Sequence, residues 1–143
     1  MSRPPLPESA RELLAKANPA VMATVRSDGA PVSAATWYLL DGDHVLLNMD
    51  DERVRLRHLR NDPRVTLTVL AEDSWYTHVT LIGEVVDFRA DDGFADIDRI
   101  SRHYGGQPYP DHERPRTTAV MAVQRWYGWG AMQDNDQASP TAD

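Results

Sequence analysis

Hydrophobic and polar residues alternate with a strand-like period over much of the chain. The first runs rich in β-branched or aromatic residues lie at 20–27, 31–40 and 43–49. Asp28-Gly29 and Asp41-Gly42 separate these runs, and Asp-Gly between two such runs is a strong signal for a hairpin. The pattern therefore predicts a three-stranded antiparallel meander in the N-terminal part of the chain.

The same period returns later in the sequence. Three further runs are rich in β-branched and aromatic residues and lie at 65–72, 75–88 and 117–129. Gly83, within the second of them, predicts a bulge or a bend. Because six strands are expected without regular alternation of strand and helix, the sequence predicts a mainly β fold with short helices. A closed or partly closed antiparallel barrel is the expected architecture.

Three short helices are expected, at 7–17, at about 50–60 and at 91–104. Apolar residues at helical spacing predict the first and the third. Asp50 or Asp51 is expected to cap the second helix, and Asn61-Asp62-Pro63 to end it. Since polar residues dominate after the last strand, we expect one domain over residues 1–130 and a flexible tail over residues 131–143.

Composition and charge narrow the classes of function. The chain of 143 residues has a formal charge of -7, and such an acidic chain is not expected to bind nucleic acid. No apolar run has membrane length, and the first residues lack the apolar segment of a signal peptide, so no membrane partner is expected. The absence of cysteine excludes disulfides and thiolate metal sites and fits a cytoplasmic protein.

Sequence signatures of catalysis and of metal binding are missing. The five histidines show no ligand spacing, so no metal site is expected. No set of nucleophile, base and acid can be assembled, and the catalytic residues stay unknown. The chain is therefore either a binding module or an enzyme in which a cofactor supplies the reactive atom.

Arginine is concentrated in residues 50–64, DDERVRLRHLRNDPR, which hold five arginines and one histidine. One interpretation is a solvated helix face with weak local ion pairs. However, the helix dipole disfavours cations at a helix N-terminus, so this placement favours an anion held there by backbone N–H and guanidinium groups. Arg53 and Arg55 lie nearest the expected helix start and are the candidates for contact with a phosphate.

Four sequence blocks resemble the pyridoxamine 5'-phosphate oxidase-like flavoproteins, in particular their branch that uses the deazaflavin coenzyme F420. The blocks are MATVRSDGAPVSAATWY, LLNMDDERVRLRHLRNDPRVTLTV, VTLIGEVV and HYGGQPYP, and the resemblance extends over about residues 13–128. It implies a six-stranded antiparallel split β-barrel of the FMN-binding type. It also implies a homodimer with a cofactor in each of two grooves at the subunit interface.

The resemblance further implies which residues bind the cofactor. The implied phosphate contacts are Arg53, Arg55 and His58; the implied ring contacts are Thr36, Trp37, Asn48 and Met49; and Trp75, Tyr76 and His78 are implied to close the groove from a neighbouring strand or subunit. For Trp37 and Trp75, a place in the barrel core is the alternative. Departures from the family pattern, such as methionine at Met49 and histidine at His58, leave the choice between flavin and deazaflavin open.

Three hypotheses follow for the function. The first is a cytoplasmic oxidoreductase that binds reduced F420 and transfers hydride to an unidentified small organic acceptor, whose proton comes from solvent, Tyr76 or His78. The second is an FMN-dependent oxidase or reductase of the same fold. The third is a protein that binds a cofactor or tetrapyrrole without catalysis. Oxidation of pyridoxamine phosphate is less favoured, because Arg114 and Arg116 are the only candidates for a second basic site.

Overall fold

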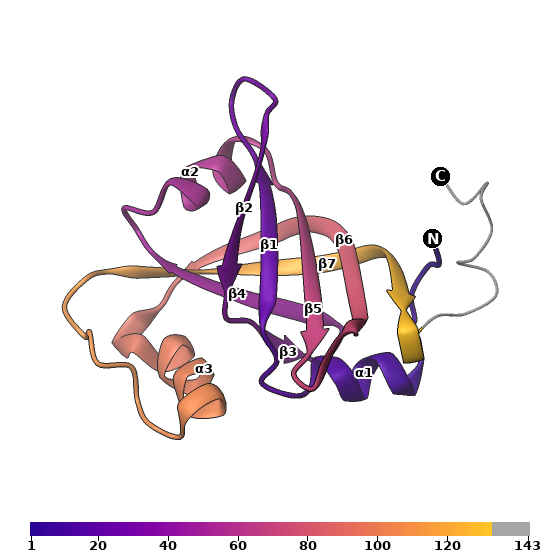
Figure 1. Cartoon of the computed structure of the whole chain (residues 1–143). Helices are drawn as coiled ribbons and strands as arrows, with labels where there is room; N and C mark the ends of the chain where they lie inside the picture. Colours follow the sequence, from indigo (N-terminus) through magenta and orange to yellow (C-terminus); the bar gives the residue numbers. More distant parts are fainter. Residues whose placement is uncertain (133–143) are drawn as a thin grey trace.

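Seven antiparallel strands in one curved sheet form the centre of the computed structural model, which describes residues 1–132 (Figure 1). The strands are β1 (Ala20–Val25), β2 (Pro31–Thr36), β3 (Leu39–Asp41), β4 (His44–Asp50), β5 (Arg64–Ala71), β6 (Ser74–Ala90) and β7 (Arg116–Trp129). Their order across the sheet is β2-β1-β5-β6-β7-β4-β3. The mainly β class with short helices is thus confirmed. Most of the predicted tail lies outside the described residues.

The expected strand at 31–40 is in fact two strands, and the predicted meander is wrong. β2 pairs with β1 and β3 pairs with β4, so these two strands form opposite edges of the sheet. Between them the chain turns at Trp37 and Tyr38. The Tyr38 side chain is only 1% exposed, and its hydroxyl donates hydrogen bonds to the backbone carbonyls of Leu14 and Lys16. These contacts fix the turn and redirect the chain from one edge of the sheet to the other.

The barrel is not closed by hydrogen bonds. Over residues 1–132 no ladder joins β2 to β3, so a seven-stranded open sheet replaces the expected six-stranded barrel. One predicted detail of the sheet is confirmed: the register between β6 and β7 shifts at Gly83. A Cβ atom at this position would collide with the backbone carbonyl of Ala122, which explains why glycine occupies the bulge.

Three helices flank the sheet: α1 (Glu8–Leu14), α2 (Val54–Asn61) and α3 (Ala95–Gly105), with 3-10 turns η1 (Asp92–Phe94) and η2 (Gly130–Met132). Figure 1 shows α2 and α3 at the left end of the sheet and α1 at its lower right. The prediction that Asp50 or Asp51 caps α2 is wrong. Arg53 occupies the N-cap position, because the Asp50 carboxylate accepts hydrogen bonds from the Glu52 N–H and from Arg53 Nε instead.

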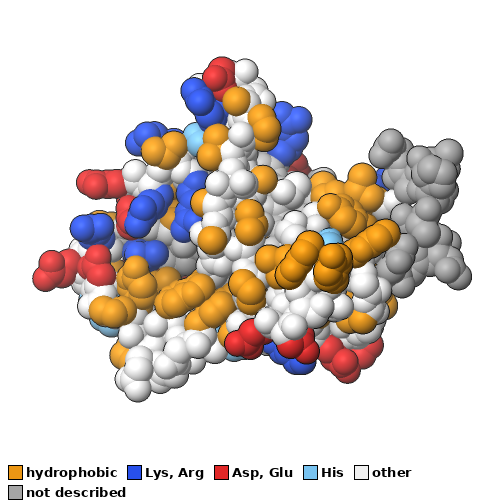
Figure 2. All heavy atoms as spheres, in the orientation of Figure 1, with side chains coloured by type: hydrophobic (Ala, Val, Ile, Leu, Met, Phe, Trp, Pro, Cys, Tyr) orange, Lys and Arg blue, Asp and Glu red, His pale blue; other side chains and the backbone are white. Residues whose placement is uncertain are grey.

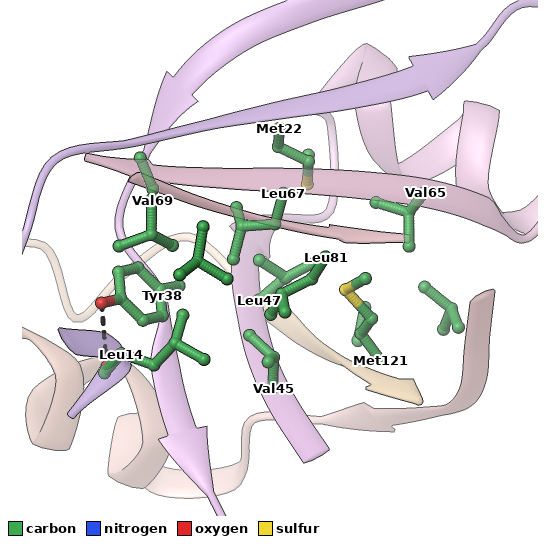
Figure 3. Packing of buried hydrophobic residues seen from close by; sticks show 14 of the residues in the cluster. Leu14, Met22, Tyr38, Val45, Leu47, Val65, Leu67, Val69, Leu81 and Met121 are labelled. Atoms are coloured by element: carbon green, nitrogen blue, oxygen red, sulfur yellow. Dashed lines mark hydrogen bonds between the residues drawn. The ribbon is translucent and has the colours of Figure 1, made fainter. Parts of the chain in front are cut away.

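The main core lies inside the curve of the sheet (Figure 3) and contains side chains from α1 and from most strands. On β4, Val45, Leu47 and Met49 point into this core. The alternate residues of β4 face α3, where Leu46 packs in a second small cluster with α3. Because side chains alternate along a strand, β4 separates the core from the face on which Asn48 lies.

Candidate functional site

A cleft of about 610 Å³ lies between the start of α2, the turn after β2, and α3. Its lining comes from segments that are far apart in the sequence: Ala17, Pro19, Ala20, Ala35, Thr36, Trp37, Asn48, Arg53, Arg55, Ile97, Ile100, Tyr104, Tyr109 and Arg116. Figure 2 shows several Lys or Arg side chains beside α2 and a row of hydrophobic side chains between them and α3. One side of the region is therefore cationic and the other apolar.

The two predicted phosphate contacts, Arg53 and Arg55, both line this cleft. Arg53 is largely exposed, and its Nε lies 3.0 Å from Asp50 Oδ2. Arg55 is half-buried, and its Nε is buried without a hydrogen-bond partner among the described residues. Burial lowers the pKa of the Arg55 guanidinium, and the positive charges of Arg53 and Arg116 lower it further. A cation held in this way fits an anionic ligand group.

The start of α2 reinforces this preference for an anion. No side chain of residues 1–132 caps the helix, and its first turn contains no acidic residue. The first N–H groups of a helix without a cap, together with the helix dipole, favour negative charge. A second cleft of about 530 Å³, lined mainly by β1, β2 and the start of α2, shares Ala35, Arg53 and Arg55 with the first. The arginine pair therefore lies where the two clefts meet.

His58, the third predicted phosphate contact, lies one turn further along α2. It lines the second cleft, and its Nδ1 is 2.9 Å from the hydroxyl of Thr24 on β1. This contact orients the imidazole ring. The structure thus places His58 beside the arginine pair but outside the larger cleft.

Aromatic side chains form the wall of the larger cleft opposite α2. The Trp37 ring stacks on the Tyr104 ring with centroids 5.0 Å apart, and the Tyr109 ring meets Trp37 edge-on at 6.2 Å. Trp37 is 39% exposed, so it is not a barrel-core residue. Burial raises the pKa of Tyr104 to about 12, and its hydroxyl donates a hydrogen bond to the Asn18 carbonyl. This wall provides a stacking surface for a planar ring.

A buried polar network supports the floor of the cleft. The Asn48 Oδ1 accepts a hydrogen bond of 2.7 Å from Arg116 Nε, and its Nδ2 donates to Asp91 and Thr118, both at 3.0 Å. Asp91 also accepts hydrogen bonds from two backbone N–H groups in the first turn of α3. The network therefore fixes the amide of Asn48, the guanidinium of Arg116 and the position of α3 together.

Five predicted residues line the larger cleft: Thr36, Trp37, Asn48, Arg53 and Arg55. Met49 is 1% exposed and lies in the core on the other face of β4, away from the cleft. Trp75 is 65% exposed and stacks on Tyr76 with centroids 4.2 Å apart. His78 lies nearby, with Nδ1 3.1 Å from the Tyr76 carbonyl oxygen. Neither Trp75 nor His78 lines the two clefts, and their contribution from a second subunit stays a prediction.

The site residues that the sequence predicts do not include Tyr104 or Tyr109, although both belong to the block HYGGQPYP that carries the resemblance. Their aromatic character beside two glycines was the available signal. Within the part of the chain that the structure describes, no group of three His, Asp or Glu side chains is placed to hold a metal ion. None of the helices over residues 1–132 is long and apolar enough to cross a membrane.

Comparison with known proteins identifies similar sequences and structures. The family profile described as pyridoxamine 5'-phosphate oxidase matches residues 6–130. A solved F420 reductase is 27% identical, with a TM-score of 0.77 over 85% of this chain and 98% of that chain. A heme binding protein from Mycobacterium smegmatis is 25% identical, with a TM-score of 0.63 over 91% of this chain and 56% of that one. A conserved hypothetical protein from Mycobacterium tuberculosis, at 19% identity and a TM-score of 0.67, covers 99% of this chain and 98% of its own length and shows the same fold.

Proposed function

Because the chain belongs to the pyridoxamine 5'-phosphate oxidase family, we propose that it is an oxidoreductase that binds reduced coenzyme F420 and transfers hydride to an organic acceptor. The observation that carries this proposal is Arg55, a half-buried cation whose Nε has no hydrogen-bond partner among residues 1–132, at the junction of two clefts. The F420 reductase at 27% identity supports a deazaflavin as the cofactor.

The residues of the cleft fit such a cofactor. Arg53 and Arg55 hold the phosphate, since guanidinium groups match phosphate oxygens in charge and geometry, and His58 is a further contact. Trp37, Thr36 and Asn48 line the same cleft and would contact the ring. When bound, the reduced coenzyme supplies a hydride, and the acceptor then takes one proton, which we assign to solvent.

Cofactor titration tests the proposal. Purified protein is titrated with F420 and, separately, with FMN, and binding is followed by cofactor fluorescence. We expect Arg55→Glu to weaken F420 binding by about 100-fold or more, because charged hydrogen bonds contribute about 1.5–3 kcal/mol each and the new carboxylate repels phosphate. Arg57→Glu is the matched control, because Arg57 is exposed on the same helix and lines neither cleft. If Arg55→Glu binds F420 as tightly as wild type, the phosphate assignment is wrong.

The same titrations, together with activity assays, distinguish two alternative functions. Tight binding of FMN without binding of F420 supports an FMN-dependent oxidase or reductase, since the arginine pair suits either phosphate. The heme binding protein at 25% identity favours a second candidate function, the binding of a cofactor or tetrapyrrole without catalysis. Tight binding without turnover of any acceptor supports this candidate.

We also propose that the protein is a cytoplasmic homodimer. Exposed aromatic side chains gather near the start of β6 and the end of β7, namely Trp75, Tyr76, Tyr127 and Trp129. Trp129 lies opposite His78, and Tyr127 lies opposite Thr80, in the β6–β7 ladder. Aromatic residues are enriched at subunit interfaces, so a second copy is the partner that we expect against these side chains. Sedimentation velocity tests this assembly.

A further inference from the structure

Arg116, the first residue of β7, lines the larger cleft together with Arg53 and Arg55 but is held in a different way. The residue is only 9% exposed. Its Nε donates a hydrogen bond of 2.7 Å to Asn48 Oδ1, and its guanidinium carbon lies 4.7 Å from the centre of the Tyr109 ring. These two contacts fix the orientation of the guanidinium group.

Over residues 1–132 no carboxylate is in direct contact with the Arg116 guanidinium, although its charge helps to lower the pKa of Asp111. Asp50 is its cross-strand neighbour, but the Asp50 carboxylate is engaged by Arg53 and by the Glu52 N–H. Both oxygens of Asp91 accept hydrogen bonds from α3, and one of them also accepts from Asn48. The two terminal nitrogens of Arg116 have no hydrogen-bond partner over residues 1–132.

We propose that Arg116 and Tyr109 form a second anion subsite, which binds the carboxylate of the acceptor, and that the acceptor is a planar conjugated carboxylate, which takes the hydride and one proton across a polarised double bond. This inference rests on the proposed function, in which the cofactor phosphate occupies Arg53 and Arg55. The terminal N–H groups of one guanidinium match the two oxygens of one carboxylate. The stacked rings of Trp37 and Tyr104 supply an apolar surface for the planar part of the same molecule.

The neighbouring aromatic ring strengthens this subsite. Tyr109 covers one face of the Arg116 guanidinium and excludes water there, and a charged hydrogen bond is stronger where water is excluded. The loop that carries Tyr109 is itself fixed, because the Tyr109 N–H donates a hydrogen bond of 2.8 Å to Asp98 on α3. The cation and its aromatic cover are therefore in place before a ligand binds, which reduces the entropy lost on binding.

Two probes that differ only in charge test the subsite. Binding of 2-naphthoate and of the neutral 2-naphthamide is measured by isothermal titration calorimetry, with cofactor-free protein and with F420-saturated protein. We expect wild type to prefer the carboxylate by about tenfold or more, as charged hydrogen bonds imply. Arg116→Gln reduces this preference to about twofold or less. Arg116→Lys keeps a cation but loses the paired N–H donors of the planar guanidinium, so it retains part of the preference for 2-naphthoate over 2-naphthamide.

The matched control is Arg114→Gln. Arg114 lies two positions away, its side chain is 70% exposed, and it contacts Asp111 rather than the cleft. This variant keeps the wild-type preference for 2-naphthoate. Thermal unfolding followed by circular dichroism identifies any variant that is not folded, and the Arg116→Lys result then decides whether charge or packing was lost.

Three outcomes overturn the inference: equal binding of the two probes by wild type, an unchanged preference in Arg116→Gln, or loss of F420 binding in Arg116→Gln as large as in Arg55→Gln. The last outcome assigns Arg116 to the cofactor phosphate instead. Failure of the proposed function gives a different result. In that case wild type binds no F420, while the preference of cofactor-free protein for 2-naphthoate still depends on Arg116.

Discussion

Replacing Arg55 with methionine should stabilise the cofactor-free protein and weaken cofactor binding at the same time. Within the described part of the chain the Arg55 Nε is buried without a hydrogen-bond partner, and the positive charges of Arg53 and Arg116 repel that of Arg55. An unsatisfied buried polar group costs about 1–3 kcal/mol. Because Arg55 is only half-buried, we take the lower end, about 1 kcal/mol. Methionine preserves the apolar part of the side chain and removes both the positive charge and the Nε–H donor that has no acceptor.

The magnitudes of the two effects can be worked out separately. A gain of about 1 kcal/mol raises Tm by roughly 3–5 °C in a domain of this size. In the cofactor-bound protein the same substitution removes charged hydrogen bonds to the phosphate, and each of them contributes about 1.5–3 kcal/mol to the free energy of binding. Two such bonds correspond to a loss of at least about 100-fold in affinity. The effects on stability and on binding therefore have opposite signs.

Thermal unfolding of the cofactor-free protein and fluorescence titration with F420 measure the two effects. Arg57→Met is the control, since this exposed residue of α2 lines neither cleft, and we expect its Tm to change by less than about 2 °C. A lower Tm for cofactor-free Arg55→Met would show that the guanidinium stabilises the empty fold. The reasoning about an uncompensated cation would then be refuted.

Three further predictions concern the supporting structure. The pKa of Asp98 lies below its usual 3.8, chiefly because of the hydrogen bond from His112. The ionised Asp98 therefore stabilises the fold above about pH 3.8, and this stabilisation is lost as the pH falls through the folded-state pKa. Thermal scans should show that Asp98→Asn has a lower Tm than wild type at about pH 6 and that the difference disappears toward about pH 2. Tyr38→Phe removes a buried hydroxyl that bonds two carbonyls near the end of α1, and urea unfolding should show a loss of about 1–2 kcal/mol. Tyr127→Glu should shift a dimer toward monomer in sedimentation velocity. Val86→Glu, also exposed but nearer the other end of β6, should not, and equal behaviour of the two variants would contradict the proposed interface.

Local patterns in the sequence predict the elements of this fold better than their pairing. The β1–β2 hairpin around Asp28-Gly29 and the bulge at Gly83 follow from residues that are close in sequence, and both are confirmed. The break at Trp37-Tyr38 was not predictable in this way. Both residues continue the strand pattern, and the turn depends on hydrogen bonds to α1 and on pairing with opposite edges of the sheet.

The site shows the same limit. The arginine pair at α2 was identified because its members are neighbours in sequence and their charge is unusual in an acidic chain. Asn48 and Met49 were both assigned to the ring by resemblance, but adjacent strand residues face opposite sides, and only Asn48 faces the cleft. Arg116 is paired with β4 only through the sheet register, so its place beside Arg55 depends on tertiary structure.

The buried amide of Asn48 links the two halves of the cleft. Its oxygen holds Arg116, and its nitrogen donates to Asp91, which also binds the first turn of α3. α3 carries Tyr104, and hence one ring of the aromatic wall. If one hydrogen bond of this buried chain is broken, a buried polar group loses its partner, and this costs free energy. Displacement of α3 and reorientation of Arg116 are therefore coupled. The spacing between the cation and the stacking surface is therefore set by the fold, and if Arg116 binds the carboxylate as proposed, we expect the cleft to discriminate between planar anions of different length.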